Sequence, residues 1–296
     1  MGILWQKCTD RTGKEYMEIT GFEGRIRCLS VPREIEEIPV RSVGKNAFSG
    51  REDLEAVILP ATIDTLGRYA FYNCRNLRTL SLYDGVEDYY DGVIKQCESL
   101  SEITLFQERG SCSVMKELLA DNDRMLHFVL EPMGLHLTFP AYVYQFVEDV
   151  EARVLHHKIE GSGYPYRECV TRRGVDLLNY DRLFSHVVTD DYHAAVEIAL
   201  GRLMYPVELE QNAKEIYGQY LEQNADVVLG ELVPAGRLEE IRFLCDTLRI
   251  PRQSLAPALE LTVKEQKPQI TAVLMEYQRK HFESKKKGNT LSLEDW

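Results

Sequence analysis

The apolar and polar positions of the first hundred residues follow one order three times. When the sequence is aligned with itself at a shift of 23 residues, Leu54 meets Leu77 and then Leu100. Six further columns stay apolar, the last two of them adjacent: Val57, Leu80 and Ile103; Leu59, Leu82 and Leu105; Val40, Ile63 and Val86; Val43, Leu66 and Tyr89; and Ala47-Phe48, Ala70-Phe71 and Val93-Ile94. Because so short a unit cannot bury its apolar side alone, the copies are predicted to stack as a solenoid.

Each copy contains the pattern Leu-x-x-Leu/Val-x-Leu, for example from Leu77 to Leu82. Its second half alternates apolar and polar residues, which predicts one short half-buried strand per turn and a curved sheet. Residues between the leucines then point away from the core. We expect Ile58 and Tyr83 to stand exposed, and Phe106 either to do so or to be covered by the next domain. The candidate protein-binding residues are Ile58, Thr79, Ser81, Tyr83, Thr104 and Phe106.

Two segments carry a family resemblance. Val43-Gly-Lys-Asn-Ala-Phe48 and Leu66-Gly-Arg-Tyr-Ala-Phe71-Tyr-Asn-Cys74-Arg-Asn-Leu77 resemble the BspA-type leucine-rich repeat, and the likeness spans about residues 14–106. It implies protein binding, and some members are cell-surface adhesins. Departures from the pattern are also visible. Arg51 stands where Cys74 and Cys97 recur, and Tyr90 replaces the glycine of the third copy.

Two residue types in these copies receive a structural interpretation. Gly44 and Gly67 are expected where the chain bends tightly, because glycine adopts such turns without steric cost. Cys74 and Cys97 are interpreted as core residues that pack as small hydrophobic side chains. The drifted third copy is typical of a terminal repeat that caps a solenoid or leads into another domain.

After the repeats the patterns change. Residues 113–120 predict a short helix, and 125–130 with 135–139 predict two strands that form a hairpin or extend the solenoid sheet. Residues 141–159 predict a helix, because apolar residues recur at spacings of three and four, and 161–167 predict a loop. From Asp191 the pattern predicts paired helices over 192–204, 209–223, 227–233, 237–248, 255–263 and 269–282.

These helix pairs indicate an α-solenoid. The segment Gly236-Arg-Leu-Glu-Glu-Ile241-Arg-Phe-Leu244 is similar to the second helix of an ankyrin repeat. The Thr-Pro-Leu-His signature is absent, so another helix-pair repeat stays open. In the helix over 209–223, Ile216, Tyr220 and Leu221 are predicted to face inward.

The fold class is therefore α+β and multidomain: a short leucine-rich-repeat solenoid with a curved sheet, an α+β junction and a C-terminal α-solenoid of ankyrin-like helix pairs. The predicted domains are a BspA-type leucine-rich-repeat domain at 1–106, an α+β junction at 107–190, a helical-repeat domain at 191–283 and a flexible tail at 284–296.

The composition of the chain limits the classes of partner that it is expected to bind. The chain has 296 residues, 44% of them hydrophobic, and a net charge of −12. Because no segment of the chain is basic, we expect it to bind neither nucleic acid nor an anionic membrane surface. No stretch reaches 18 consecutive apolar residues, so no membrane insertion is expected. Seven cysteines without a CxxC pair favour free thiols and a cytoplasmic location, since no signal peptide is recognisable.

Candidates for chemistry are few. His156-His157 with Cys169 is the tightest His/Cys group, but adjacent histidines on a helix diverge and no protease signature surrounds Cys169. Gly161-Ser-Gly163 is neither a nucleophile elbow nor a phosphate loop. Glu148, Asp149 and Glu151 are interpreted as a solvated helix face. We therefore predict no catalytic, cofactor-binding or metal-binding residues.

The predicted function is non-enzymatic: a protein–protein interaction or scaffold protein that uses its repeat surfaces. Two alternatives stay open. One is an enzyme with a site in residues 107–190 and repeats as substrate receptors, which needs His156, Cys169 and an acid to converge on a pocket. The other is a cell-surface adhesin, if an export signal precedes this sequence in the full protein.

Overall fold

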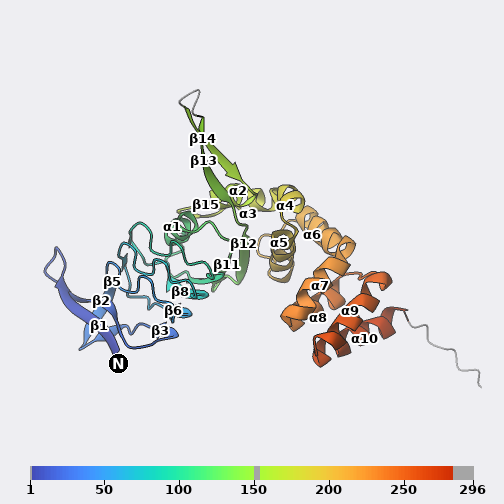
Figure 1. Cartoon of the computed structure of the whole chain (residues 1–296), viewed down its shortest axis with the longest axis horizontal. Helices are drawn as coiled ribbons and strands as arrows, with labels where there is room; N and C mark the ends of the chain where they lie inside the picture. The colour runs from blue at the N-terminus through green and yellow to red at the C-terminus, as the bar shows by residue number, and fades with distance from the viewer. Residues whose placement is uncertain (1, 150–153, 283–296) are drawn as a thin grey trace, which may run out of the picture. The chain divides into compact units, whose positions relative to one another are not determined.

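The chain is seen here as a computed structural model that describes residues 2–149 and 154–282. It contains two compact units, Met1–Lys214 and Glu215–Trp296 (Figure 1). The predicted boundaries at residues 106 and 190 stay predictions, and the predicted tail at 284–296 lies outside the described residues.

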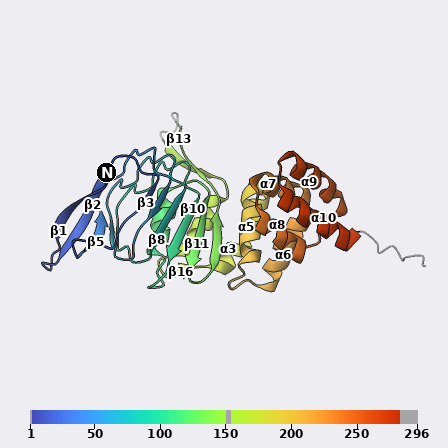
Figure 2. The same cartoon turned by 90° about the horizontal axis from the view of Figure 1, so that it is seen from below.

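The first unit begins with a β-solenoid of about five turns, which is built on two six-stranded sheets. The first sheet has the strand order β1 (Gly2–Thr9), β2 (Glu15–Glu23), β5 (Ile38–Val43), β7 (Thr65–Leu66) and β9 (Asp88–Tyr89), with β4 (Glu34–Ile35) paired to β5. The second has the order β12 (Leu135–Phe139), β11 (Leu126–Glu131), β10 (Glu102–Phe106), β8 (Thr79–Tyr83), β6 (Ala56–Ile58) and β3 (Cys28–Ser30). Figure 2 shows β3, β8, β10 and β11 side by side.

The strand register reproduces the sequence shift. Ala56 pairs with Thr79, and Thr79 pairs with Glu102, all in parallel strands. In the first sheet Thr65 pairs with Asp88 in the same way. Each residue therefore lies beside its equivalent in the next turn, which confirms the 23-residue repeat and one strand of the second sheet per turn.

The repeating apolar columns form the core. Leu54 and Leu77 are fully buried, and Leu100 is nearly so. Phe48 stacks on Phe71 of the next turn, with ring centroids 5.4 Å apart. Equivalent residues of consecutive turns thus pack on one another, and stacking buries the apolar sides that single turns cannot bury.

Gly44 and Gly67 are needed for a reason other than the predicted tight bend. Neither has a positive φ. A Cβ on Gly67 would lie 2.7 Å from the backbone of Gly44 and Lys45, so glycine here permits close approach of consecutive turns. The left-handed positions are instead two other columns: Asn46, Tyr69 and Gly92, and Gly50, Asn73 and Gln96.

The recurring cysteines have a polar role as well as a packing one. Cys74 Sγ donates to the carbonyl of Phe48 at 3.1 Å, and Cys97 Sγ donates to Phe71 at 3.1 Å, each in the preceding turn. Burial raises the pKa of the Cys74 thiol to about 11 and that of Cys97 to about 12. Both thiols therefore stay protonated and satisfy a buried carbonyl.

Arg51, in the same column, reaches the preceding turn with a longer side chain. Its Nη1 donates to the carbonyl of Phe22 at 2.9 Å, and its Nε and Nη2 hold Asp53. Asp53 in turn accepts from the backbone N–H of Ile26 at 2.8 Å. Arginine in place of cysteine therefore connects the irregular first turn to the regular second turn.

The junction begins as predicted. The predicted helix at 113–120 is α1 (Ser113–Asp121), and Val114, Leu118 and Leu119 are buried. β11 pairs in parallel with β10, and β12 returns antiparallel to β11. The two predicted strands thus form a hairpin and also extend the solenoid sheet.

The predicted helix over 141–159 is wrong. Residues there form β13 (Val143–Asp149) and β14 (Val154–Glu160), an antiparallel hairpin that projects from the unit (Figure 1). The segment is rich in valine and aromatic residues, which favour strands, and this preference overrides the helical spacing. Glu148 and Asp149 accordingly lie on a strand rather than on a helix face.

The predicted loop over 161–167 is also wrong, because it contains α2 (Gly163–Glu168). Arg167 on this helix is 6% exposed and donates to five backbone carbonyls, those of Leu119, Asn122, Arg124, Pro140 and Gly163. Its guanidinium also lies over the Tyr142 ring. Because each carbonyl is a partial negative charge, this buried cation joins α1, β12 and α2.

The unit continues through short elements into longer helices. These are β15 (Val170–Thr171), β16 (Gly174–Val175), α3 (Leu177–Arg182), α4 (Phe184–Asp190) and α5 (Tyr192–Met204). Asp191 caps α5 by accepting from the N–H of Ala194 at 3.1 Å, so this helix begins and ends where the sequence predicted.

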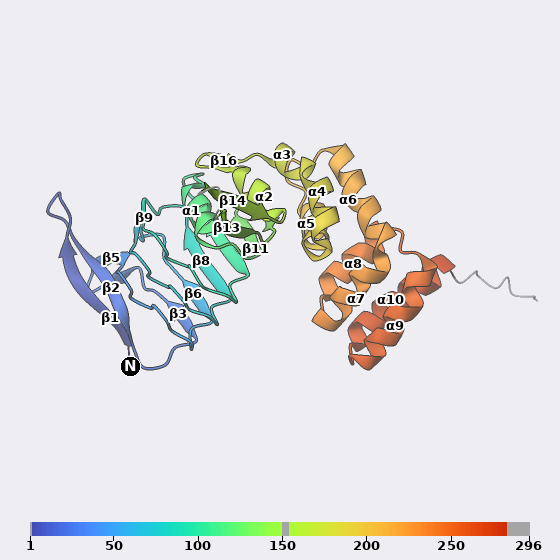
Figure 3. The ribbon, with the colours of Figure 1, turned by 45° about the horizontal axis from the view of Figure 1, so that its top comes forward.

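Helices α6 (Gln211–Gln223), α7 (Ala225–Ala235), α8 (Leu238–Thr247), α9 (Arg252–Lys264) and α10 (Pro268–Phe282) follow, and α6 spans the boundary between the units. In the second unit α7 packs on α8 and α9, and α10 packs on α8 and α9 (Figure 3). The predicted helix pairs are confirmed. Two details are wrong: Ile216 is exposed while its neighbour Tyr217 is buried, and α7 continues through Pro234 to Ala235.

Candidate functional site

The outward side of the second sheet brings the predicted binding residues together. On β8 the residues alternate strictly, with Leu80 and Leu82 buried and the residues between them open to solvent. The register places Ile58, Ser81 and Thr104 in one row across β6, β8 and β10. We call the outward residues of this sheet the strand face: Ala56, Ile58, Thr79, Ser81, Tyr83, Glu102, Thr104, Phe106, His127, Val129, Glu131 and His136.

All six predicted binding residues lie on the strand face. Ile58 is 45% exposed, and Thr79, Ser81, Tyr83, Thr104 and Phe106 are half-buried. Tyr83 and Phe106 pair in register, and their rings stack with centroids 4.9 Å apart at an interplanar angle of 29°. Phe106 is thus neither fully exposed nor covered, because one ring face rests on Tyr83. That these residues contact a protein stays a prediction.

A groove of about 580 Å³ opens beside this aromatic pair. Its lining residues come from the ends of β8, β10 and β11: Tyr83, Glu102, Thr104, Phe106, Gln107, Glu108, Val129, Glu131 and Pro132. The predicted binding residues Tyr83, Thr104 and Phe106 therefore line a shallow groove that is open to solvent.

Sequence reasoning missed the part of this site that β11 contributes. Val129 and Glu131 pair with Thr104 and Phe106 across the strands. They were missed because β11 follows β10 at a spacing of 25 residues rather than 23 and lacks the leucine pattern. The strict alternation of Leu126, Phe128 and Leu130 is the signal that could have revealed them.

The strand face ends at β12, where α5 covers it. The His136 ring stacks on Tyr205, with centroids 3.5 Å apart and planes 4° apart. Burial lowers the pKa of His136 below its ordinary value, although the nearby carboxylates of Glu131 and Glu102 act in the opposite direction. Burial thus favours the neutral form of the His136 imidazole.

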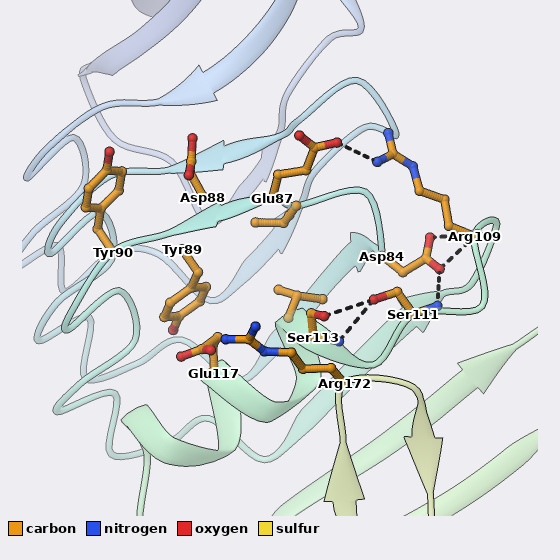
Figure 4. A pocket seen from close by; sticks show the side chains of 12 residues that line it. Asp84, Glu87, Asp88, Tyr89, Tyr90, Arg109, Ser111, Ser113, Glu117 and Arg172 are labelled. Carbon is orange, nitrogen blue, oxygen red and sulfur yellow. Dashed lines mark hydrogen bonds and ion pairs between the residues drawn. The ribbon is translucent and has the colours of Figure 1, made fainter.

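A second cavity, of about 550 Å³, lies beside β9 at the end of the first sheet (Figure 4). Asp84 at its rim accepts backbone N–H groups of Glu108, Arg109 and Ser111 at 2.9–3.2 Å. Arg109 also pairs with Glu87 at 2.8 Å. These polar groups mainly hold the loop after β10 in place, which is a structural role.

The predicted chemistry candidates are not brought together in the described residues. The side chains of His156 and His157 and all of Glu151 lie outside the described part. Cys169 is buried, contacts the Pro165 carbonyl and the Asn179 amide, and lines neither cavity. Burial raises the pKa of its thiol to about 11, which disfavours the nucleophilic thiolate.

Residues 2–149 and 154–282 contain neither a metal-ligand cluster nor a membrane-spanning helix. There, no three His, Cys, Asp or Glu side chains converge in a geometry that could hold a metal ion. Within the same residues, no helix combines the length and apolar character needed to cross a membrane.

Comparison with known proteins finds a family match for part of the solenoid. The family described as "BspA type Leucine rich repeat region (6 copies)" matches residues 30–118. These residues are thus a BspA-type leucine-rich repeat region, which confirms that part of the resemblance. The match does not extend to the helix pairs, so their likeness to ankyrin repeats is not confirmed.

Solved structures similar to this chain are also leucine-rich repeat proteins. One from T. pallidum is 26% identical over 34% of this chain and 50% of that protein, with a TM-score of 0.31. One from Bacteroides ovatus is 21% identical over 36% of this chain and 30% of that protein, with a TM-score of 0.29. A leucine-rich cell surface protein from Faecalibacterium prausnitzii is 21% identical over 35% of this chain and 31% of that protein, also with a TM-score of 0.29. The match thus spans half or less of each of these proteins. No curated protein matches the chain.

Proposed function

We propose that this is a non-enzymatic binding protein whose strand face holds a protein partner. The observation that carries the proposal is that Ile58, Tyr83 and Phe106 all lie on the outward side of one sheet, where the Tyr83 ring stacks on Phe106. Solenoids commonly bind through such extended concave surfaces. Aromatic side chains are frequent anchors in protein interfaces, because they bury a large area at a low cost in conformational entropy.

The rigidity of the face supports the same proposal. Its strands are held by the buried leucines beneath them and by parallel pairing on both sides of β8 and β10. A partner that docks on it need not order the backbone, so little of the contact energy is lost on binding.

The test is capture of the partner by the immobilised chain, with the bound proteins quantified by mass spectrometry. The double variant Ile58→Ser with Tyr83→Ala removes two anchors from the strand face. The control Tyr90→Ala removes an exposed tyrosine that follows β9 in the other sheet. We expect one set of proteins to be lost with the double variant and kept with the control. Retention of every captured protein by the folded double variant would refute the proposal.

We further propose that this protein is cytoplasmic. All seven cysteines are free, and Cys28 is exposed, which is typical of a reducing compartment. The adhesin alternative predicts a surface location instead. Fractionation of the source organism, followed by immunoblotting, separates the two: detection in the washed surface fraction would favour the adhesin.

A further inference from the structure

The groove beside Tyr83 and Phe106 carries charge of one sign. Its three charged residues are Glu102, Glu108 and Glu131, and its lining contains no lysine or arginine. Phe106 pairs in register with Glu131, so this carboxylate stands one strand away from the aromatic pair. Glu102 lies on the same side of β10 as Phe106, four residues earlier. Glu131 therefore lies beside the half-buried aromatic pair, and Glu102 lies farther along β10 on the same face.

Other carboxylates of the solenoid have arginine partners. Glu55 pairs with Arg27 at 2.8 Å, and Asp64 pairs with Arg41 at 2.6 Å. Within the described residues, none of the three groove glutamates has a lysine or arginine within ion-pair distance. Some acidic side chains of the solenoid are thus neutralised by arginine, whereas the three groove glutamates are not.

A cation is the ligand that this combination recognises. The face of an aromatic ring attracts a positive charge, and the attraction strengthens where water is partly excluded. A planar guanidinium can stack on a ring and donate two hydrogen bonds to a carboxylate, which an ammonium group cannot do. The stacked rings offer the first contact and the glutamates the second.

We propose that this groove holds an arginine side chain on a basic, extended segment of the protein partner. The inference rests on the proposed function, because it names the chemistry of the partner that the strand face binds. It assigns Tyr83 and Phe106 as the stacking surface and Glu102, Glu108 and Glu131 as the carboxylates that select a positive charge.

The probe is a fluorescein-labelled peptide, acetyl-Gly-Arg-Gly-Arg-Gly, and its neutral analogue carries citrulline in place of arginine. Binding to the full chain is followed by fluorescence anisotropy at low and at physiological salt. The groove variant is Glu102→Gln with Glu131→Gln. The matched control is Glu52→Gln with Glu98→Gln, which removes the same charge at exposed sites outside the groove lining.

We expect the arginine peptide to bind the wild-type chain and the groove variant to bind it about tenfold more weakly. The control should change affinity less than about twofold, because exposed charges outside the groove are screened by salt. The citrulline peptide should bind no more tightly to the wild-type chain than the arginine peptide binds to the groove variant.

Three results would overturn the inference: no binding of the arginine peptide, equal losses in the groove and control variants, or equal binding of the citrulline peptide. Each leaves the proposed function testable by itself. If Ile58→Ser with Tyr83→Ala still abolishes capture of the partner, the strand face binds a protein whose contact is not cationic.

Discussion

The solenoid and the helical unit constrain their sequences in different ways. In the solenoid, single positions must satisfy backbone geometry: Gly67 admits the neighbouring turn, and Cys74 satisfies a carbonyl of the preceding turn. In the helical unit, Ile241 and Leu244 need only be apolar and suitably spaced to be buried. The first kind of constraint demands particular residues and repeats them, whereas the second accepts many residues. That difference explains why a family is recognisable in one region and not in the other.

The largest expected effect comes from removing a core column. Phe71→Ala deletes a fully buried ring that stacks on Phe48. The free energy of unfolding should fall by about 3–5 kcal/mol through lost burial and the cavity left behind. Urea unfolding followed by circular dichroism measures it. An unchanged midpoint would refute the 23-residue register of the solenoid.

A pair of glycine variants contrasts the two regions directly. Gly67→Ala should destabilise the chain by about 1–3 kcal/mol, because its Cβ would overlap the backbone of Gly44. Gly230→Ala in α7 meets no atom within 4 Å, so it should stabilise the helix by up to about 1 kcal/mol. Thermal unfolding of both variants checks the signs. Equal effects would show that glycine is not needed for close approach between turns.

Acidic pH should weaken the contacts by which Arg51 and Asp53 hold the first turn. The hydrogen bonds that Asp53 accepts from Arg51 and from the N–H of Ile26 lower the pKa of the Asp53 carboxyl from 3.8 to about 2. Because the folded-state pKa is depressed, the stabilisation is present above about pH 4 and is lost as the pH falls through about 2. Asp53→Asn should therefore lower stability at pH 7 and flatten its dependence between pH 4 and pH 2. An identical pH dependence in the wild type and the variant would contradict this account.

The smallest expected change in stability is at the strand face. Ile58→Ser alters a side chain that is 45% exposed, so the free energy of unfolding should change by only about 0.5 kcal/mol. Tyr83→Ala also removes the stack on Phe106 and should cost about 1 kcal/mol. Differential scanning calorimetry of the two single variants measures both. A loss as large as that of Phe71→Ala would show that the strand face is core.

Much of this architecture could be predicted because repetition amplifies weak signals. Strands β6, β8 and β10 and the buried columns follow from three aligned copies. Outside the repeats α1, β11, β12 and α5 were predicted correctly, but the segment from Val143 onward was not: its apolar spacing fits a helix, yet β13 and β14 form a hairpin.

The candidate site was half predicted for the same reason. Tyr83 and Phe106 are equivalent residues of consecutive copies, so their stacking follows from the register. Glu131 and His136 come from outside the copies, and their placement depends on how β11 and β12 extend the sheet. Nor does the sequence reveal Arg167 as buried, because four of its five carbonyl partners come from distant segments.

The affinity of the captured partner for two tyrosine variants tests the central claim most directly. Tyr83→Ala removes half of the stacked pair on the strand face, and Tyr90→Ala removes a tyrosine that is 51% exposed after β9. If the strand face binds the partner, Tyr83→Ala should raise Kd about 30-fold, equivalent to about 2 kcal/mol, and Tyr90→Ala less than about twofold. Equal changes, or a larger change for Tyr90→Ala, would contradict the account.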